Sequence, residues 1–146
     1  MNTSQYEADF YKWIYSQAEL LKNGQLEKLD ITNLVEEIET LGRNDKKSLK
    51  NQFIRLLKHL LKKEFQPEKQ IDSNSWEFSI RNAKREILYL IKDSPSLKNE
   101  LIKMFDDVYD DSRYSASGET RLDLEIFPEI CPWTIEELFP ELNEKS

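Results

Sequence analysis

The sequence is poor in the residues that build tight turns, crosslinks and metal sites. Its 146 residues include three glycines, five prolines, one cysteine and one histidine. So few turn-forming residues disfavour an architecture of strands and tight turns. The single cysteine, Cys131, excludes a disulfide within the chain, and a lone thiol is typical of a reducing compartment. The single histidine, His59, excludes any site that needs two histidines from one chain.

Long hydrophobic runs and an excess of positive charge are also missing. No apolar run approaches the roughly 20 residues that span a membrane. The N-terminus, MNTSQYEADFYKW, lacks the positive start and apolar run of a signal peptide. The formal net charge of −7 argues against a general nucleic-acid binder, which usually carries a basic footprint. We therefore expect a cytoplasmic, soluble protein that binds no membrane, and the charge disfavours nucleic acid as a partner.

The motifs of the common enzyme classes are absent as well. The chain contains no GxxxxGK[ST], GxGxxG, GxSxG or HExxH sequence. One histidine excludes the ferritin-like di-iron arrangement, which needs two Glu-x-x-His pairs. One cysteine and one histidine cannot supply the four ligands of a structural zinc site. We therefore predict no cofactor and assign no catalytic or metal-binding residue.

Helical periodicity is what the sequence does have. Between Leu49 and Phe65, apolar residues recur at helical spacing over about half of the helix circumference. So wide an apolar arc predicts a central helix with neighbours on two sides. Its apolar positions are Leu49, Phe53, Ile54, Leu56, Leu57, Leu60, Leu61 and Phe65. We predict an all-α bundle of about five main helices, folded as a single domain over residues 1–146.

The other helices are predicted from their end signals. A first helix is expected to run from a Ser4 cap to Gly24. A short helix follows from residue 33, ends at Gly42, and turns Leu34, Val35, Ile38 and Leu41 inward. Two more helices are expected over residues 74–93 and 95–118. An extended, proline-rich C-terminal arm over residues 121–133 then leads to a short terminal helix with a capping box at Thr134 and Glu137.

Several segments together resemble a bacterial family, abundant in cyanobacteria, that is known only as domain of unknown function 29 (DUF29). These segments are YEADFYKWIYSQAELLKNGQLEKLDITNLVEEIETLG at Tyr6–Gly42, LLKHLLK at Leu56–Lys62, Gln66-Pro67, Ser75-Trp76, Ile80-Arg81, DSPSL at Asp93–Leu97, and FPEICPWTIEELF at Phe127–Phe139. The family pattern often has an aromatic residue where this chain has Lys63. The resemblance implies a helical bundle and supplies no activity.

His59 and Glu37 are the first candidates for a site. On the helical wheel His59 lies on a flank of the apolar arc, where it is either a general base or metal ligand, or a partly exposed residue hydrogen-bonded to a neighbouring helix. Glu37, with Glu36 and Glu39, either supplies hard-metal ligands or complements a helix dipole. A site that joins Glu37 to His59 requires their two helices to dock flank to flank.

Charge segregation supplies the other candidates. Residues 45–64 carry seven basic and two acidic side chains, whereas residues 106–111 read DDVYDD. Asp107 and Asp111 form a like-charge pair one turn apart, which costs a few tenths of a kcal/mol (~0.2–0.5) in an isolated helix. The aspartates are either a solvated face, or are neutralised by the basic helix, or bind a basic partner or a divalent cation.

Three functional hypotheses remain. The leading one is a non-enzymatic interaction protein that binds a protein partner or a second copy of itself through charged faces or exposed aromatics. The alternative is a metal-dependent or acid–base enzyme built on Glu37 and His59. The weakest is nucleic-acid binding through the basic side chains of the central helix, which are Lys46, Lys47, Lys50, Arg55, Lys58 and Lys62. A nucleophilic role for Cys131 is disfavoured, because His59 is the only histidine that could serve as its base.

Overall fold

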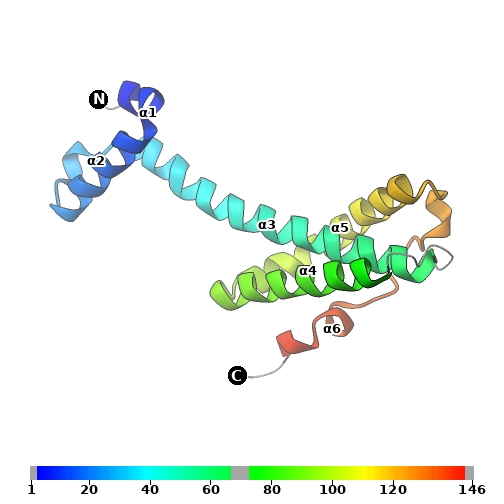
Figure 1. Ribbon diagram of the computed structural model, residues 1–146. Coiled ribbons are helices and arrows are strands. Elements are labelled where there is room, and N and C mark those ends of the chain that lie inside the picture. Colours follow the sequence, from blue (N-terminus) through cyan, green and yellow to red (C-terminus); the bar gives the residue numbers. More distant parts are fainter. Residues whose placement is uncertain (1–2, 67–72, 144–146) are drawn as a thin grey trace. The chain divides into compact units, whose positions relative to one another are not determined.

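The chain is helical throughout most of its length. The computed structural model describes residues 3–66 and 73–143. Over these residues it contains six α-helices and no strand, which confirms the all-α prediction (Figure 1). The helices are α1 (Thr3–Ala8), α2 (Phe10–Lys22), α3 (Ile31–Phe65), α4 (Ser73–Asp93), α5 (Leu97–Thr120) and α6 (Ile135–Leu138). The described residues also form the short 3-10 helices η1 (Leu26–Lys28) and η3 (Leu124–Ile126) in the connections, and η4 (Pro140–Asn143) after α6.

The predicted first helix is in fact two helices. Asp9 separates α1 from α2, and its carboxylate accepts a hydrogen bond of 3.1 Å from the backbone N–H of Lys12. An aspartate that caps a following helix in this way leaves the helical conformation itself, which explains the break. Gly24 closes the segment as expected, with a left-handed φ of 70°. The side chain of Ser4, the predicted cap, lies outside the described residues.

The prediction that Gly42 ends a helix is wrong. α3 is one helix of 35 residues that continues through Gly42 to Phe65. Glycine in a helix interior costs only about 1 kcal/mol relative to alanine, and it keeps its backbone hydrogen bonds. Gly42 also lacks the positive φ that marks Gly24 as a helix terminator. In the absence of a proline or a left-handed residue, the helix therefore propagates through this position.

The chain divides into two compact units, Met1–Asn44 and Asp45–Ser146, called unit 1 and unit 2 below. Unit 1 holds α1, α2, η1 and the beginning of α3. Its buried centre is the Trp13 ring, which lies 4.6 Å from the Tyr6 ring and 5.6 Å from the Phe10 ring between centroids. The prediction of a single domain over residues 1–146 stays a prediction.

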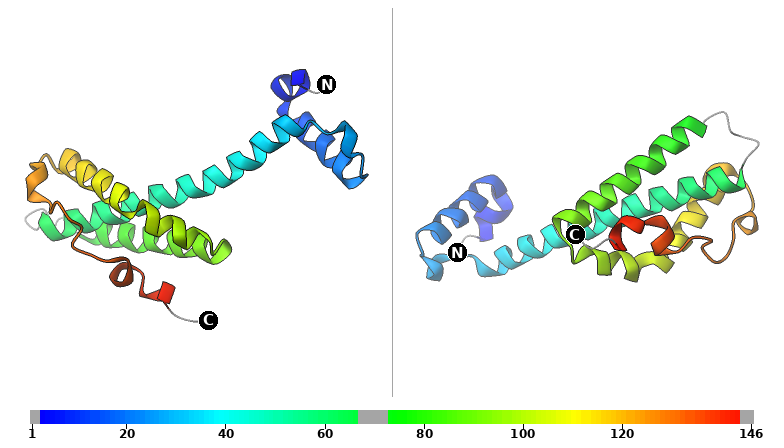
Figure 2. Two further views of the ribbon diagram at one scale, coloured as in Figure 1. Left: turned by 180° about the vertical axis from the view of Figure 1, so that it is seen from behind. Right: turned by 90° about the horizontal axis from the view of Figure 1, so that it is seen from below.

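Unit 2 is built around the later part of α3. Here α3, α4 and α5 lie side by side, as all views show (Figures 1 and 2). The predicted central helix is confirmed, since it buries Leu49, Phe53, Leu56, Leu57 and Leu61. The Phe53 ring stacks on Phe105 of α5 and meets Phe139 edge to face, with centroid distances of 5.7 and 5.8 Å. One apolar core thus joins the three helices to the C-terminal segment.

The C-terminal arm is anchored by buried aromatic rings and by backbone carbonyls. Phe127 is fully buried, and its carbonyl accepts a hydrogen bond of 2.9 Å from Arg113 Nε. The Tyr109 hydroxyl donates to the carbonyl of Pro128 at 2.5 Å. Beyond the arm, the predicted capping box of Thr134 and Glu137 is present and starts α6. The arm therefore fixes α5 and α6 within unit 2.

Candidate functional site

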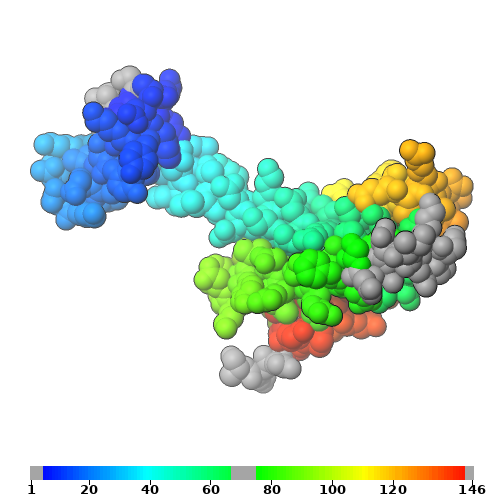
Figure 3. Space-filling view, viewed as in Figure 1, coloured from blue at the N-terminus to red at the C-terminus, as the bar shows by residue number. Residues whose placement is uncertain are grey.

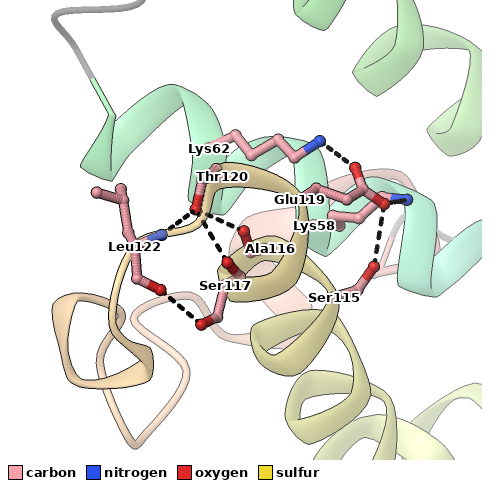
Figure 4. A network of polar contacts seen from close by, with 8 residues as sticks. All are labelled: Lys58, Lys62, Ser115, Ala116, Ser117, Glu119, Thr120 and Leu122. Carbon is pink, nitrogen blue, oxygen red and sulfur yellow. Dashed lines mark hydrogen bonds and ion pairs between the residues drawn. The ribbon is translucent and has the colours of Figure 1, made fainter.

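A polar network joins the last turns of α3 to the last turns of α5 (Figure 4). Glu119 lies at its centre and accepts a hydrogen bond from Lys62, one of 2.9 Å from Lys58, and one of 3.3 Å from Ser115 Oγ. Beside it, Thr120 Oγ1 donates to the Ala116 carbonyl at 2.7 Å. The same oxygen accepts from the backbone N–H of Leu122 at 3.2 Å, which closes the end of α5.

The charged groups of this network are one carboxylate and two ammonium groups, all within unit 2. Burial by itself would raise the pKa of Glu119, but the hydrogen bonds from Lys62 and Lys58 outweigh burial and lower that pKa to about 2. The carboxylate is therefore ionised at neutral pH and engaged by two ammonium groups. A base needs a pKa near the working pH, so Glu119 fastens two helices rather than transferring protons.

His59 lies beside the network and is half-buried. Its Nδ1 atom is buried and has no hydrogen-bond partner among the residues that the structure describes. Burial first, and then the positive charges of Lys62, Lys58 and Arg55, lower the pKa of the imidazole to about 4. His59 is therefore neutral at neutral pH. The expected hydrogen bond to a neighbouring helix is not made by Nδ1.

Glu37 lies in unit 1. It accepts a hydrogen bond from the Tyr6 hydroxyl, and this bond raises the pKa of Tyr6 to about 12. Glu37 and His59 both belong to α3, 22 positions apart, and not to the two docked helices that a joint site requires. Over the described ranges, no group of three or more His, Cys, Asp or Glu side chains is arranged to hold a metal ion.

The acidic face of α5 is exposed, as predicted, and part of it is neutralised within unit 2. Asp107 and Asp111 both lie at the surface. Asp111 lies 3.8 Å from the Lys50 ammonium of α3. Other lysines of α3 also meet carboxylates in unit 2: Lys46 meets Glu100 at 3.2 Å, Lys58 and Lys62 meet Glu119, and Lys63 meets Glu77. These ion pairs weigh against nucleic-acid binding through α3, which stays a prediction.

Cys131 lines a surface hollow of about 540 Å³ between α5 and the arm. Burial is the main reason why the pKa of its thiol is raised, and the charge of Asp106 adds to the shift. Thiolate is the reactive form, so these surroundings make the thiol less reactive.

A basic groove on α4 was not anticipated from the sequence. It has a volume of about 470 Å³ and is lined by Arg81, Lys84, Arg85, Leu88, Tyr89 and Lys92, with Glu141 of η4 at its edge. In the space-filling view, the green surface of α4 lies uncovered beside the red C-terminal segment (Figure 3). The signal was present in the sequence, because these residues recur at intervals of three and four and therefore share one helix face.

The charges of the basic groove are only partly neutralised. Lys84 lies 3.1 Å from a Glu141 oxygen. Arg81, Arg85 and Lys92 have no carboxylate within ion-pair distance among the described side chains. The Arg85 guanidinium instead donates a hydrogen bond of 3.2 Å to the Tyr89 hydroxyl, and its central carbon lies 5.4 Å from the Tyr89 ring centre. The groove thus offers positive charge around an aromatic and aliphatic floor.

Val35, Ile38 and Leu41 were predicted to face inward, and that prediction is wrong, whereas Leu34, predicted with them, is half-buried. With Ile31 the three exposed residues form an apolar stripe on the first part of α3. The exposed fractions of its members are 62% for Ile31, 48% for Val35, 65% for Ile38 and 68% for Leu41. They follow one another at intervals of four, three and three residues on one side of the helix. Unit 1 buries Trp13 instead, and the Trp13 indole N–H donates a hydrogen bond of 3.0 Å to Asp30, which directly precedes α3.

Together these features define an all-helical protein with an exposed apolar stripe and a basic groove, and with no assembled catalytic centre among its described residues. No helix in the described part is long and apolar enough to cross a membrane. The chain belongs to the family described as Domain of unknown function DUF29, whose model matches residues 5–142. The comparisons with curated proteins and with solved structures gave no match.

Proposed function

We propose that the protein is a non-catalytic interaction module that binds another protein through the apolar stripe of unit 1. The observation that carries this proposal is the placement of apolar side chains. Within the described part of unit 1, Trp13 is the buried hydrophobic residue, whereas Ile31, Val35, Ile38 and Leu41 are all exposed. Contiguous apolar surface of this kind is typical of a protein-binding site.

The free energy that such a site can contribute is substantial. Fully burying an isoleucine, leucine or valine side chain stabilises a complex by roughly 1.5–3 kcal/mol. The stripe offers four such side chains on the outside of a regular helix, so their positions are fixed before binding. Fixed positions reduce the conformational entropy that association costs. The stripe therefore fits a partner surface with an apolar centre.

Charge specifies the partner further. Residues 1–44 hold eight acidic and four basic side chains, a net charge of −4. Glu39 flanks the stripe, is exposed, and has no ion pair among the described side chains. Complementary charges at the rim of an interface raise the association rate and select the partner. We therefore infer a protein surface with an apolar centre and a cationic rim.

Photo-crosslinking in cells that produce the protein tests this proposal. A benzophenone amino acid at position 38 should give an adduct with one protein, and the crosslinked peptide should lie in a segment rich in Lys and Arg. The same probe at position 32, an exposed threonine off the stripe, serves as the matched control. Val35→Lys should abolish the adduct, since it places a charge at the centre of the contact.

The outcomes separate clearly. Loss of the adduct in the Val35→Lys chain, together with its retention in a Lys103→Glu chain, supports the proposal, because Lys103 is an exposed cation of unit 2. Equal labelling from positions 32 and 38, or an adduct that survives Val35→Lys, contradicts it. An adduct with a second copy of this chain and an adduct with a foreign protein both support the proposal, provided that they meet these conditions.

A further inference from the structure

We infer that the basic groove on α4 is the partner surface, so that unit 1 of one copy binds the groove of a second copy. This inference rests on the proposed function and names the partner that the proposed function leaves open. It is carried by an independent observation, which is the set of groove cations that have no carboxylate within ion-pair distance among the described side chains.

The basic groove has the chemistry that the apolar stripe requires. Leu88 and Tyr89 supply an apolar floor, and Arg81, Arg85 and Lys92 supply positive charge at its sides. Elsewhere in unit 2, the lysines of α3 at positions 46, 50, 58, 62 and 63 each meet a carboxylate. Lys47 and Arg55 of α3 likewise have no carboxylate within ion-pair distance among the described side chains, but the groove gathers three such cations around an apolar floor.

Charge argues that the stripe of one copy binds the groove of a second copy and not the stripe of a second copy. A contact between the stripes of two copies would bring together two units that each have a net charge of −4, and like charges repel each other. Exposed Glu39, beside the stripe, instead finds free guanidinium groups at Arg81 and Arg85, and arginine binds carboxylates in a bidentate manner. The apolar stripe at the same time covers Leu88 and the exposed ring of Tyr89.

A contact between two different surfaces makes the association heterologous. After the first contact, one copy keeps its groove free and the other keeps its stripe free, so association continues until a ring closes or the chain of copies ends. Wild-type protein should therefore increase in mass with concentration. Added salt should reverse this increase, because mobile ions screen the charged rim.

A complementation experiment tests the inference. One variant, Val35→Lys with Ile38→Lys, disables the stripe and keeps the groove. The other, Arg81→Glu with Arg85→Glu, disables the groove and keeps the stripe. All four positions are exposed, so both variants should keep the helical content of the wild type by circular dichroism. Lys47→Glu with Lys103→Glu is the matched control, since it reverses two exposed cations outside the groove.

Size-exclusion chromatography with light scattering measures the masses. Each disabled variant alone should be a monomer, with self-association weakened by at least about tenfold. An equimolar mixture of the two should give a one-to-one dimer, because one intact stripe then meets one intact groove. The control variant should associate as the wild type does.

Three results would overturn the inference. The first is a wild-type chain that stays monomeric at every concentration. The second is a groove variant that associates like the wild type while the stripe variant does not, and this result leaves the proposed function intact. The third is a mixture that stays monomeric although both variants are folded, which indicates symmetric pairing or a foreign partner.

Discussion

Acidification should destabilise unit 2 through His59. The pKa of the folded imidazole is about 4, compared with 6.5 for an unperturbed histidine. A lowered histidine pKa means that the stabilising neutral form is fully present above pH 6.5. That stability is lost as the pH falls from 6.5 toward 4, because the unfolded chain takes up the proton first. The two pKa values give a loss of about 2 kcal/mol between pH 7.5 and pH 5, and about 3 kcal/mol in full.

Two measurements test this prediction, and the composition makes both of them simple. The chain has one histidine, so its imidazole NMR signals need no assignment among rivals. Their chemical shifts should titrate with a midpoint near 4. Urea unfolding at pH 7.5 and pH 5 should show the loss in the wild type. His59→Leu and His59→Gln should both remove most of it, because neither side chain takes up a proton.

The window from pH 7.5 to pH 5 separates His59 from the carboxylates. The pKa of Glu119 is lowered from 4.5 to about 2, so its contribution is present above pH 4.5 and lost below it. Arg55→Gln should raise the midpoint of His59, since the Arg55 charge helps to lower that pKa. A wild-type midpoint near 6.5, or an equal loss of stability in His59→Leu, would refute the reasoning.

Three further predictions concern single residues. Gly42→Ala should raise the free energy of unfolding by roughly 0.5–1 kcal/mol, because the new Cβ lies in a helix interior and meets nothing within 4 Å. Gly24→Ala should lower the free energy of unfolding, because φ is +70° at this position. Thermal unfolding of the two variants compares them directly. Asp30→Ala should destabilise unit 1 by about 1–2 kcal/mol, because the carboxylate accepts hydrogen bonds from the Trp13 indole at 3.0 Å and from the Asn33 side-chain amide at 2.8 Å. Faster hydrogen exchange of the α2 backbone amides should report this loss. Cys131 should react slowly with iodoacetamide at neutral pH, because burial raises the pKa of its thiol, and unfolding in urea should restore the rate of a free thiol.

Local signals predicted well wherever neighbouring residues decide the structure. The Thr134–Glu137 capping box needs only four consecutive residues, and it is present. The buried face of the central helix follows from periodicity alone. Gly42 and Asp9 were misjudged for a related reason: glycine is compatible with both a helix interior and a helix end, and aspartate with both a helix and a cap. Tertiary context decides between these states, and local sequence does not contain it.

The candidate site depended on contacts between helices, which sequence did not supply. The cations of α3 are numerous, and they suggested the main positive surface of the protein. The structure pairs most of them with carboxylates of α4 and α5, such as Glu77, Glu100 and Glu119. The smaller set on α4 remains available. Counting charges along the chain could not distinguish a neutralised lysine from a free arginine, because the partners lie far away in the sequence.

The apolar stripe shows the corresponding limit for hydrophobic residues. The spacing of Val35, Ile38 and Leu41 establishes that one face of the helix is apolar, but periodicity does not say which surface covers it. A face covered by its own chain and a face covered by a second copy obey the same rule. The distinction lies in the rest of the surface: Glu39 beside the stripe and Arg85 in the groove are both left without an ionic partner in the described structure. One chain thus carries an anionic and a cationic group that each lack an ionic partner in the described structure. This argues that association between copies supplies a partner to both groups.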